Sequence, residues 1–462
     1  MPFDRSVVLN PDTGRPLDIP AERRLDEPFN EMDGQSHLAQ LSLDHRLGRG
    51  WSGHVNLSYN RETYDAGQLR VNRVDTATHT LRRSSDATHG ALSTDAYGTA
   101  YVDGSAEWGG FRHDIQIGMD AEYRKIYRKD LLRSPSRNAF DYLNPVYGLD
   151  TPSTVVVASD SDQTDQLHNQ SLFVQEAMHL NDQWILVGGV RYLQWSQRAG
   201  RGRPFRANTD TRDSAWLPRL GLVYQWQPEV SVYLSYSQSL KPSSTIAPLS
   251  NNTVIDSSMK PEEGKSWEIG AKYEAPGGLT ATLALFNIDK KNVIVSQYNE
   301  ALGRNQVRTA GAARSRGIEL DVAGQLNDRW SLIGSLAWID AKTTRDPLYV
   351  GNRLWNVARV TTSASLVHDF GQVADLGQIR SGARIRYVGK RPGDAANSFW
   401  LPSYAVTDLF STYETPLFGR NTRFQFNIKN LFDRTYYPSA ANQYGISIGE
   451  PRQLSLQMSF DL

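Results

Sequence analysis

The stretch QLSLQMSFDL, residues 453–462, decides the fold class. Its apolar side chains, Leu454, Leu456, Met458, Phe460 and Leu462, alternate with Gln453, Ser455, Gln457, Ser459 and Asp461. Successive side chains of a β-strand point to opposite faces, so this pattern predicts a strand with one apolar and one polar face. About ten such residues are enough to cross a bilayer as a tilted strand. We expect the apolar set to face lipid, with Gln457 and Ser459 pointing inward.

The same alternation recurs along the chain, for example in Gly53–Asn60, Asp114–Glu122 and Ile379–Gly389. Strands are predicted near 36–46, 51–62, 93–108, 111–127, 167–180, 183–198, 216–226, 229–239, 264–274, 278–290, 307–326, 329–343, 357–370, 376–389, 402–414, 422–431 and 451–462. A soluble β-sandwich would also show period-two alternation. The pattern therefore predicts an all-β chain and leaves its environment open.

The connections between these strands favour a membrane barrel over a sandwich. Short connections such as Gly109–Gly110 and Gln227–Pro228 alternate with long ones near 63–92, 128–166, 199–215, 240–263, 291–306, 344–356, 390–401 and 432–450. Outer-membrane barrels have tight periplasmic turns and long external loops, which gives this alternation. Tryptophans near strand ends, such as Trp108 and Trp184, are typical of interfacial girdles. The sequence predicts a transmembrane antiparallel β-barrel.

Composition narrows the class further. The 462 residues include no cysteine, and 50 basic residues balance 50 acidic ones, so nothing indicates a nucleic-acid partner or a thiolate metal site. Mean hydropathy is negative and no apolar run reaches 18 residues, which excludes a helical membrane protein. The first residues, MPFDRSVVLNPDTGRPL, lack the basic and apolar regions of a signal peptide.

The number of predicted strands indicates an incomplete barrel. Seventeen is odd, whereas single-chain bacterial barrels have an even number of strands with both ends in the periplasm. We therefore expect residues 1–35 to be the remnant of an extracellular loop and residues 36–462 to be a partial barrel. An open barrel leaves unpaired strand edges in hydrocarbon, so this fragment should not be stable in a membrane alone.

Four motifs resemble the TonB-dependent ferric-siderophore receptors, and the resemblance covers essentially the whole chain. They are NIKNLFDRTYYPSAANQYGISIGEPRQLSLQMSFDL (427–462), LPRLGLVYQWQPEVSVYLSYSQSLKP (217–242), KPEEGKSWEIGAKYE (260–274) and GAARSRGIELDVAGQL (311–326). The family fold is a 22-stranded barrel filled by a plug. The resemblance implies that about 17 of the 22 strands are present, while the plug, the TonB box and the signal peptide are absent.

The resemblance also implies a function. The parent protein would be an outer-membrane receptor that transports a ferric siderophore inward, energised by TonB through the missing amino-terminal region. It would not be an enzyme, and it would need no cofactor because the siderophore carries the iron. Its other partners would be outer-membrane lipid and, through the carboxy-terminal strand, the outer-membrane assembly machinery. The last residue is Leu462 where the family usually has Phe.

Candidate ligand-binding residues come from the predicted inner face and the external loops. Arg380, Arg384 and Arg386 share one face of a strand, where they either guide an anionic ferric chelate or pair with the plug or with Glu319 and Asp321. External aromatic residues that could pack on a siderophore are Tyr298, Trp355, Trp400, Tyr436, Tyr437 and Tyr444, together with Tyr142 and Tyr147. Asp160, Asp162 and Asp165 could hold a divalent cation, although a solvated loop explains them as well.

Three alternatives stay open. A haem or cobalamin receptor of the same family is the first, but the F-R-A-P and N-P-N-L motifs of haem receptors are missing from YSQSLKPSS (236–244). The second is a passive porin, against which the family motifs speak. The third is a non-functional truncated gene product, and we expect the 462 residues alone not to support siderophore uptake. No G-x-S-x-G, H-E-x-x-H or P-loop motif indicates catalysis.

Overall fold

The computed structural model describes residues 6–20, 22–136, 138–244, 253–255, 260–299, 304–373, 377–417 and 419–460. These residues form strands, turns and loops without any helix. In particular, they include no helix with the length and apolar character needed to cross a membrane. The all-β prediction is confirmed.

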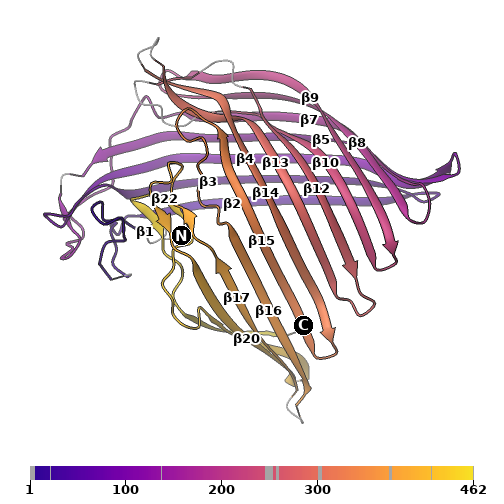
Figure 1. The fold of residues 1–462 in the computed structure, drawn as a ribbon. Helices are drawn as coiled ribbons and strands as arrows, with labels where there is room; N and C mark the ends of the chain where they lie inside the picture. Colours follow the sequence, from indigo (N-terminus) through magenta and orange to yellow (C-terminus); the bar gives the residue numbers. More distant parts are fainter. Residues whose placement is uncertain are drawn as a thin grey trace.

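Seventeen long strands form one curved antiparallel sheet within the described residues (Figure 1). They are β2 (Glu31–Gly48), β3 (Trp51–Asp75), β4 (Thr80–Trp108), β5 (Phe111–Pro135), β7 (Gln163–His179), β8 (Trp184–Arg201), β9 (Arg206–Gln227), β10 (Val230–Lys241), β12 (Glu262–Glu274), β13 (Thr280–Asn299), β14 (Arg304–Asn327), β15 (Trp330–Arg345), β16 (Val360–Gln372), β17 (Gln378–Val388), β20 (Tyr404–Leu417), β21 (Arg420–Lys429) and β24 (Gln453–Phe460). They correspond one to one to the predicted strands, and each pairs with its neighbours in this order.

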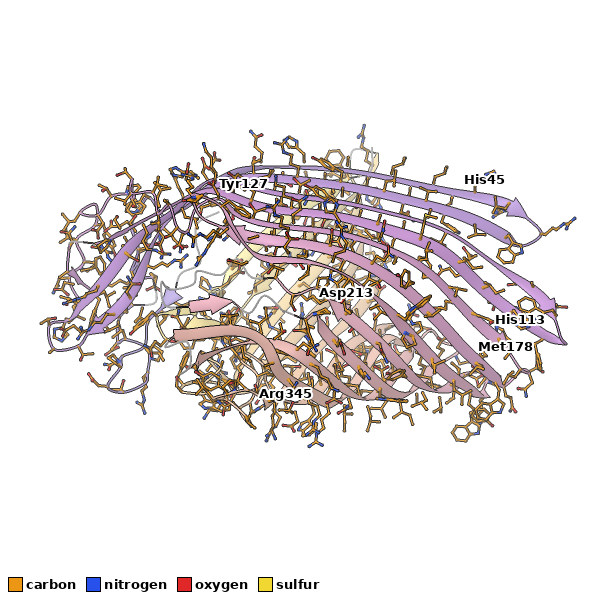
Figure 2. The ribbon with its side chains drawn as sticks, turned by 90° about the horizontal axis from the view of Figure 1, so that it is seen from above. His45, His113, Tyr127, Met178, Asp213 and Arg345 are labelled. Atoms are coloured by element: carbon orange, nitrogen blue, oxygen red, sulfur yellow. The ribbon has the colours of Figure 1, made fainter. Side chains whose placement is uncertain are left out.

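The remaining strands are short and lie in the connections or, in the case of β1, before the first long strand. They are β1 (Ser6–Val7), β6 (Phe140–Asp141), β11 (Thr253–Ile255), β18 (Arg391–Pro392), β19 (Trp400–Leu401), β22 (Ala440–Asn442) and β23 (Gly445–Ser447). β11 runs parallel to β14, whereas β1 pairs with β23 and β18 with β19 in small separate sheets. Short turns lie at one end of the long strands and long connections at the other. His45, His113 and Met178 mark the short-turn end in Figure 2, with Tyr127 toward the opposite end.

Three of the predicted long loops are in fact extensions of the strands. β3 and β4 continue through the expected loop 63–92 and leave only residues 76–79 between them. β8 and β9 likewise leave only residues 202–205 between them. Only residues 300–303 separate the end of β13 from the start of β14. Beyond the membrane neither face of a hairpin meets lipid, so the regular apolar alternation that reveals a strand disappears while the backbone ladder continues. The prediction of loops in these three segments was wrong for that reason, because the strands continue through them.

The register of the strands separates two faces of the sheet. On one face, Ile379, Tyr413, Phe424 and Met458 lie side by side on β17, β20, β21 and β24. On the other face, one residue along, Arg380, Thr412, Gln425 and Gln457 form the parallel row. Lipid requires the apolar row and an aqueous interior accepts the polar row. The predicted orientation of the last strand is therefore confirmed for residues 453–460, and Leu462 lies outside the described residues.

Buried apolar clusters occur among the external connections. Residues 6–20 and 22–30, here called the amino-terminal strap, supply Val8, Leu17 and Leu25 to one cluster. Their partners there are Val74, Leu81, Phe140 and Tyr142, which come from the β3–β4 hairpin and the β5–β7 connection. The strap also contains β1, which pairs with β23 and lies close to the amino terminus in Figure 1. The strap thus links the β3–β4 hairpin to the connection that precedes β24.

A buried ion pair fastens the strap. Arg83 of β4 contacts Glu27 at 2.8 Å and Asp150 at 2.7 Å. The side chains of Arg83 and Glu27 are essentially inaccessible to solvent, and the Arg83 guanidinium also lies 4.0 Å above the ring of Phe140. Removing one member of a buried ion pair leaves its partner unpaired in a medium of low polarity. The strap is therefore held by a contact that depends on all three charged residues.

The first and last long strands form the two ends of the sheet. Within the described residues β2 pairs with β3 alone and β24 with β21 alone. All 18 residues of β2 and all eight of β24 are exposed. The long strands thus form a wall with two free edges, whose backbone groups need partners wherever they meet hydrocarbon. The predicted division at residue 35 stays a prediction, although the first long strand begins at Glu31.

The two faces of β24 predict opposite effects of one substitution. Arginine at the midplane of the lipid face of a barrel strand costs about 2–4 kcal/mol, while an aqueous interior tolerates it. Met458→Arg should therefore reduce the yield of assembled protein in outer-membrane fractions far more than Gln457→Arg. Quantitative blotting of these fractions measures the difference. Equal yields of the two variants would contradict the register.

Candidate functional site

The three predicted arginines lie on the inner face of β17. Arg380 contacts Asp369 of β16 at 2.9 Å, so its charge is neutralised within the wall. The acidic partners that the sequence suggested, Glu319 and Asp321, lie on β14, with β15 and β16 between them and β17. Arg380 pairs instead with an acid of the adjacent strand, while Asp321 lines the same hollow as Arg384. The predicted role of the three arginines in ligand binding stays a prediction. Of the three, Arg380 is the most firmly structural.

Arg384 lies in a hollow of about 750 Å³ on the inner wall. The hollow is lined by Asp321, Val322, Ala323, Ile333, Gly334, Ser335, Ser363, Ser365, Arg384, Asp408, Leu409, Phe410, Gln425, Asn427 and Lys429. The Nε of Arg384 donates to Ser363 Oγ at 3.3 Å, and Asp408 faces Arg384 across the β17–β20 pair. Most of the lining residues are polar or charged, but the surface that they expose to the hollow is mostly apolar, so the hollow suits a ligand with both apolar and polar groups.

Arg386 connects the inner wall to the external loops. It donates to the hydroxyl of Tyr436 at 3.5 Å, and its guanidinium lies 6.0 Å from the centre of that ring. Tyr436 is buried and packs against Tyr404, with ring centres 4.6 Å apart. The structure therefore brings together two predicted site residues, Arg386 and Tyr436, at the top of the arginine column.

Trp400 lies beside two cations. The Nζ of Lys390 is 5.2 Å from its ring centre, and the guanidinium of Arg353 is 5.9 Å away. The ring face of an indole carries negative charge density and attracts cations. Two nitrogens of Arg353, Nε and Nη2, are nevertheless buried without a hydrogen-bond partner among the described residues. Burial, together with the neighbouring Arg359, lowers the pKa of Arg353 from its ordinary value.

Asparagine side chains hold the loops around Trp400 together. Asn356 donates to Ala440 O at 3.0 Å and accepts from Ala440 N at 3.1 Å. Asn397 makes the same reciprocal pair with the backbone of Arg353, at 3.0 Å in each direction. Asn356 and Asn397 both have positive φ, 60° and 56°, a region that asparagine tolerates better than most residues. The β15–β16, β17–β20 and β21–β24 connections are thereby joined into one platform.

The other predicted aromatic residues are dispersed. Tyr437 packs beside Leu401, and its carbonyl accepts from Arg391, while Tyr444 packs against the strap cluster. Trp355 is exposed, and the side chain of Tyr298 lies outside the described residues. Tyr142 is buried and Tyr147 donates to the carbonyl of Arg24. Burial also raises the pKa of Tyr437.

Trp400 is flanked by two cations, Arg353 and Lys390, that were not predicted as site residues from the sequence. Lys390 begins a short basic run, KRP at 390–392, directly after the predicted strand 376–389, and this run was the available signal. Arg353 offers no such signal, because its position beside Trp400 depends on the pairing of Asn397 with its backbone.

The acidic stretch 159–165 makes ion pairs with arginines. Asp160 contacts Arg201 at 2.9 Å, and Asp162 contacts Arg203 at 2.7 Å. Asp165 accepts from Gln197 and Ser244. In the part of the chain that the structure describes, no group of three His, Cys, Asp or Glu residues has the arrangement of a metal site. The divalent-cation hypothesis for this loop therefore gains no support.

The fold defines the class of protein. A curved antiparallel sheet has apolar side chains on one face, polar side chains on the other, and short turns at one end. This combination is that of an outer-membrane β-barrel wall.

The chain belongs to the TonB-dependent receptor-like β-barrel family, whose model matches residues 2–431. This family is a class of outer-membrane transport receptors for siderophores and metals and not of enzymes. The family resemblance that the motifs indicated is thereby confirmed.

Two relatives and one solved structure illustrate the similarity. The "Metal-pseudopaline receptor CntO" of Pseudomonas aeruginosa is 32% identical over 96% of this chain and 62% of its own length. The "Ferrioxamine B receptor" of Salmonella typhimurium is 27% identical over 89% of this chain and 56% of its own. The siderophore receptor PiuA from Acinetobacter baumannii superposes with a TM-score of 0.83 at 19% identity, over 99% of this chain and 70% of that one. The chain thus spans about three fifths of the length of these two curated relatives.

The acidic loop predicts a pH dependence of stability. The Arg203 guanidinium holds the pKa of Asp162 below its ordinary value. A carboxylate with a depressed folded pKa contributes stability above its unfolded pKa and loses it as pH falls through the folded pKa. Asp162→Asn should therefore lower the thermal stability in detergent at pH 7 and flatten its loss below about pH 4. The exposed Asp182→Asn serves as the control, and an unchanged acid limb for Asp162→Asn would contradict the coupling.

The unpaired nitrogens of Arg353 predict that its guanidinium contributes little to the stability of the fold. Replacing a buried, unsatisfied polar group by an apolar one of similar size is neutral or stabilising, here by about 1 kcal/mol. Arg353→Met should therefore keep or raise the unfolding temperature in detergent. Arg345→Met, at an exposed position at the end of β15, is the matched control. A clear loss of stability confined to Arg353→Met would show that its charge is satisfied.

Proposed function

We propose that this chain forms the ligand-binding wall of an outer-membrane receptor that imports an anionic metal–siderophore complex with energy supplied through TonB. The complex brings its own metal, so the chain needs no resident cofactor. The carboxy-terminal strand β24 would serve the assembly machinery, since its outer face is continuously apolar at Leu454, Leu456, Met458 and Phe460.

The arginine column carries the proposal. Arg380, Arg384 and Arg386 follow the inner face of β17 from its short-turn end, past the hollow that Arg384 lines, toward the external platform. Arg380 is neutralised by Asp369, whereas Arg386 contacts only a tyrosine hydroxyl and ring among the described contacts. Cations on the wall of a cleft raise the local concentration of an anionic ligand. Arg386 is such a cation without a carboxylate partner among the described contacts, whereas Arg384 shares its hollow with Asp321 and Asp408. The external end of the column is therefore the part that favours an anion.

The platform supplies the outer part of the path. Lys390 and Arg353 flank Trp400, so an anionic group and a planar chelating group of one ligand could be bound side by side. The reciprocal asparagine pairs hold these side chains in place before a ligand arrives, which reduces the ordering cost of binding. The names of the relatives, receptors for metal-pseudopaline and for ferrioxamine B, support a metal chelate as the ligand class.

Binding of chelates of different charge tests the proposal. The full chain in detergent is titrated with ferric citrate, with an anionic ferric tris-catecholate, and with a ferric trihydroxamate that carries a pendant ammonium, while tryptophan fluorescence is recorded. We expect at least one anionic chelate to bind about tenfold more tightly than the cationic one, a difference of about 1.4 kcal/mol. Arg386→Gln should reduce that preference.

The control replaces an arginine that the wall already neutralises. Arg380→Gln removes a cation from the same face of the same strand, but Asp369 already offsets its charge. It should therefore change the preference less than Arg386→Gln does. Tighter binding of the cationic chelate, or equal effects of the two substitutions, would contradict the proposal.

A further inference from the structure

A buried arginine lies inside the platform. Arg391 of β18 is 1% exposed and is the register partner of Leu401 on β19. Its Nη1 donates to Gly389 O at 3.5 Å and to Pro402 O at 3.4 Å, and its Nη2 donates to Tyr437 O. These acceptors are neutral backbone carbonyls. The guanidinium therefore joins the β17–β20 connection to the β21–β24 connection without meeting an opposite charge.

The charge of Arg391 has no anionic counterpart. Among the described residues, no carboxylate oxygen lies within 4.0 Å of its guanidinium nitrogens. The ring of Tyr404, 5.4 Å away, offers only the weaker attraction of an aromatic face. Burial lowers the pKa of Arg391 from its ordinary value, but an arginine stays charged at every physiological pH. The platform thus contains a full positive charge in a medium of low polarity, which is unfavourable without an anion nearby.

The neighbouring cations are not neutralised either. Lys390 and Arg353, which lie beside Trp400, make no ion pair among the described residues. The carboxylate whose charge acts on Arg353 is that of Asp340, which already contacts two other cations at 3.5 Å and 3.2 Å. Lys390 is exposed and Arg353 half-buried, whereas Arg391 is buried. The platform therefore has an excess of positive charge, of which Arg391 supplies the part that water and salt screen least.

A purely structural role for Arg391 does not require its charge. Backbone carbonyls accept hydrogen bonds from a neutral amide as well as from a guanidinium, so a glutamine could supply donors to some of the same acceptors. A buried cation without a partner is moreover costly to the fold. The missing countercharge among the described residues is therefore the observation that a structural role leaves unexplained.

We propose that Arg391 is a specificity-determining residue of the ligand site, and that its buried charge gives the platform much of its preference for an anionic chelate. The inference rests on the proposed function, because it assigns a source to the preference proposed there. The charge acts across a medium of low polarity, where electrostatic attraction is stronger than in water. Arg391 is desolvated already in the unoccupied protein, so ligand binding does not require its removal from water. It acts without touching the ligand.

Chelates of different charge test the source of the preference. The full chain in detergent is titrated with an anionic ferric tris-catecholate and with a neutral ferric trihydroxamate, and tryptophan fluorescence gives the ratio of the two affinities. Removing a unit charge about 10 Å from an anion, at an effective dielectric constant of about 20, changes an affinity roughly tenfold. Arg391→Gln should therefore lower the ratio roughly tenfold, whereas Arg391→Lys, which keeps the charge, should preserve it within about threefold. Arg345→Gln removes an exposed cation at the external end of β15 and should leave the ratio unchanged.

A second readout does not depend on any chelate. Iodide and acrylamide both quench the fluorescence of an accessible tryptophan, and a nearby positive charge raises quenching by iodide alone. The contribution of Trp400 is the difference between chains that carry Trp400 and chains with Trp400→Phe, at constant ionic strength. Arg391→Gln should lower the ratio of iodide to acrylamide quenching at Trp400, and Arg391→Lys should not. If the unaltered chain shows no preference between the chelates, the proposed function fails, and the iodide ratio decides about Arg391 by itself.

A loss that does not depend on charge contradicts the proposal. Equal weakening of both chelates by Arg391→Gln would show that Arg391 only holds the connections together. A loss of preference in Arg391→Lys as large as in Arg391→Gln would overturn the proposal too. Thermal unfolding checks each variant, and if Arg391→Gln does not fold, the salt dependence of the unaltered chain decides. A preference due to a buried charge should persist in about 1 M salt, where exposed charges are screened within about 3 Å, and its complete loss there would refute the inference.

Discussion

Backbone hydrogen bonding between neighbouring strands is the constraint on which this structure depends. Inside a bilayer an unpaired amide or carbonyl costs several kcal/mol, so each strand must lie beside another along its whole membrane span. The long strands satisfy this requirement in sequence order from β2 to β24. Successive side chains of each strand then face lipid and interior in turn, and the inner position of the three arginines of β17 follows from that alternation.

The two free edges of the sheet are where this requirement for backbone pairing is not met. Every residue of β2 and of β24 is exposed, and each strand has a partner on one side only. In hydrocarbon these edges require further strands, whichever chain or segment provides them. The external ends of the two edges are not independent, because the strap that leads into β2 also pairs with the connection before β24.

Sequence predicted the membrane-spanning part well because lipid imposes a simple rule on it. Strict alternation revealed all the long strands, and the faces of β17 and β24 followed from Arg384 and Met458. Outside the bilayer that rule ends. The extended β3–β4 hairpin reads as a loop, and the position of Arg353 beside Trp400 arises from contacts between residues far apart in the chain. The candidate site was accordingly predicted for its inner wall and only in part for its platform.

The strap has a consequence for how the external rim loses its structure. Its apolar cluster, its buried Arg83 contacts and the β1–β23 pair rest on three separate connections. Detaching the strap at one of them exposes Val8, Leu17 and Leu25 and leaves Arg83 without Glu27, so the other attachments weaken together. Local opening in proteins proceeds in cooperative units of this kind. Amide hydrogens of the strap, the β3–β4 tip and β23 should therefore exchange with solvent at a common rate, as a single unit distinct from the wall beneath it.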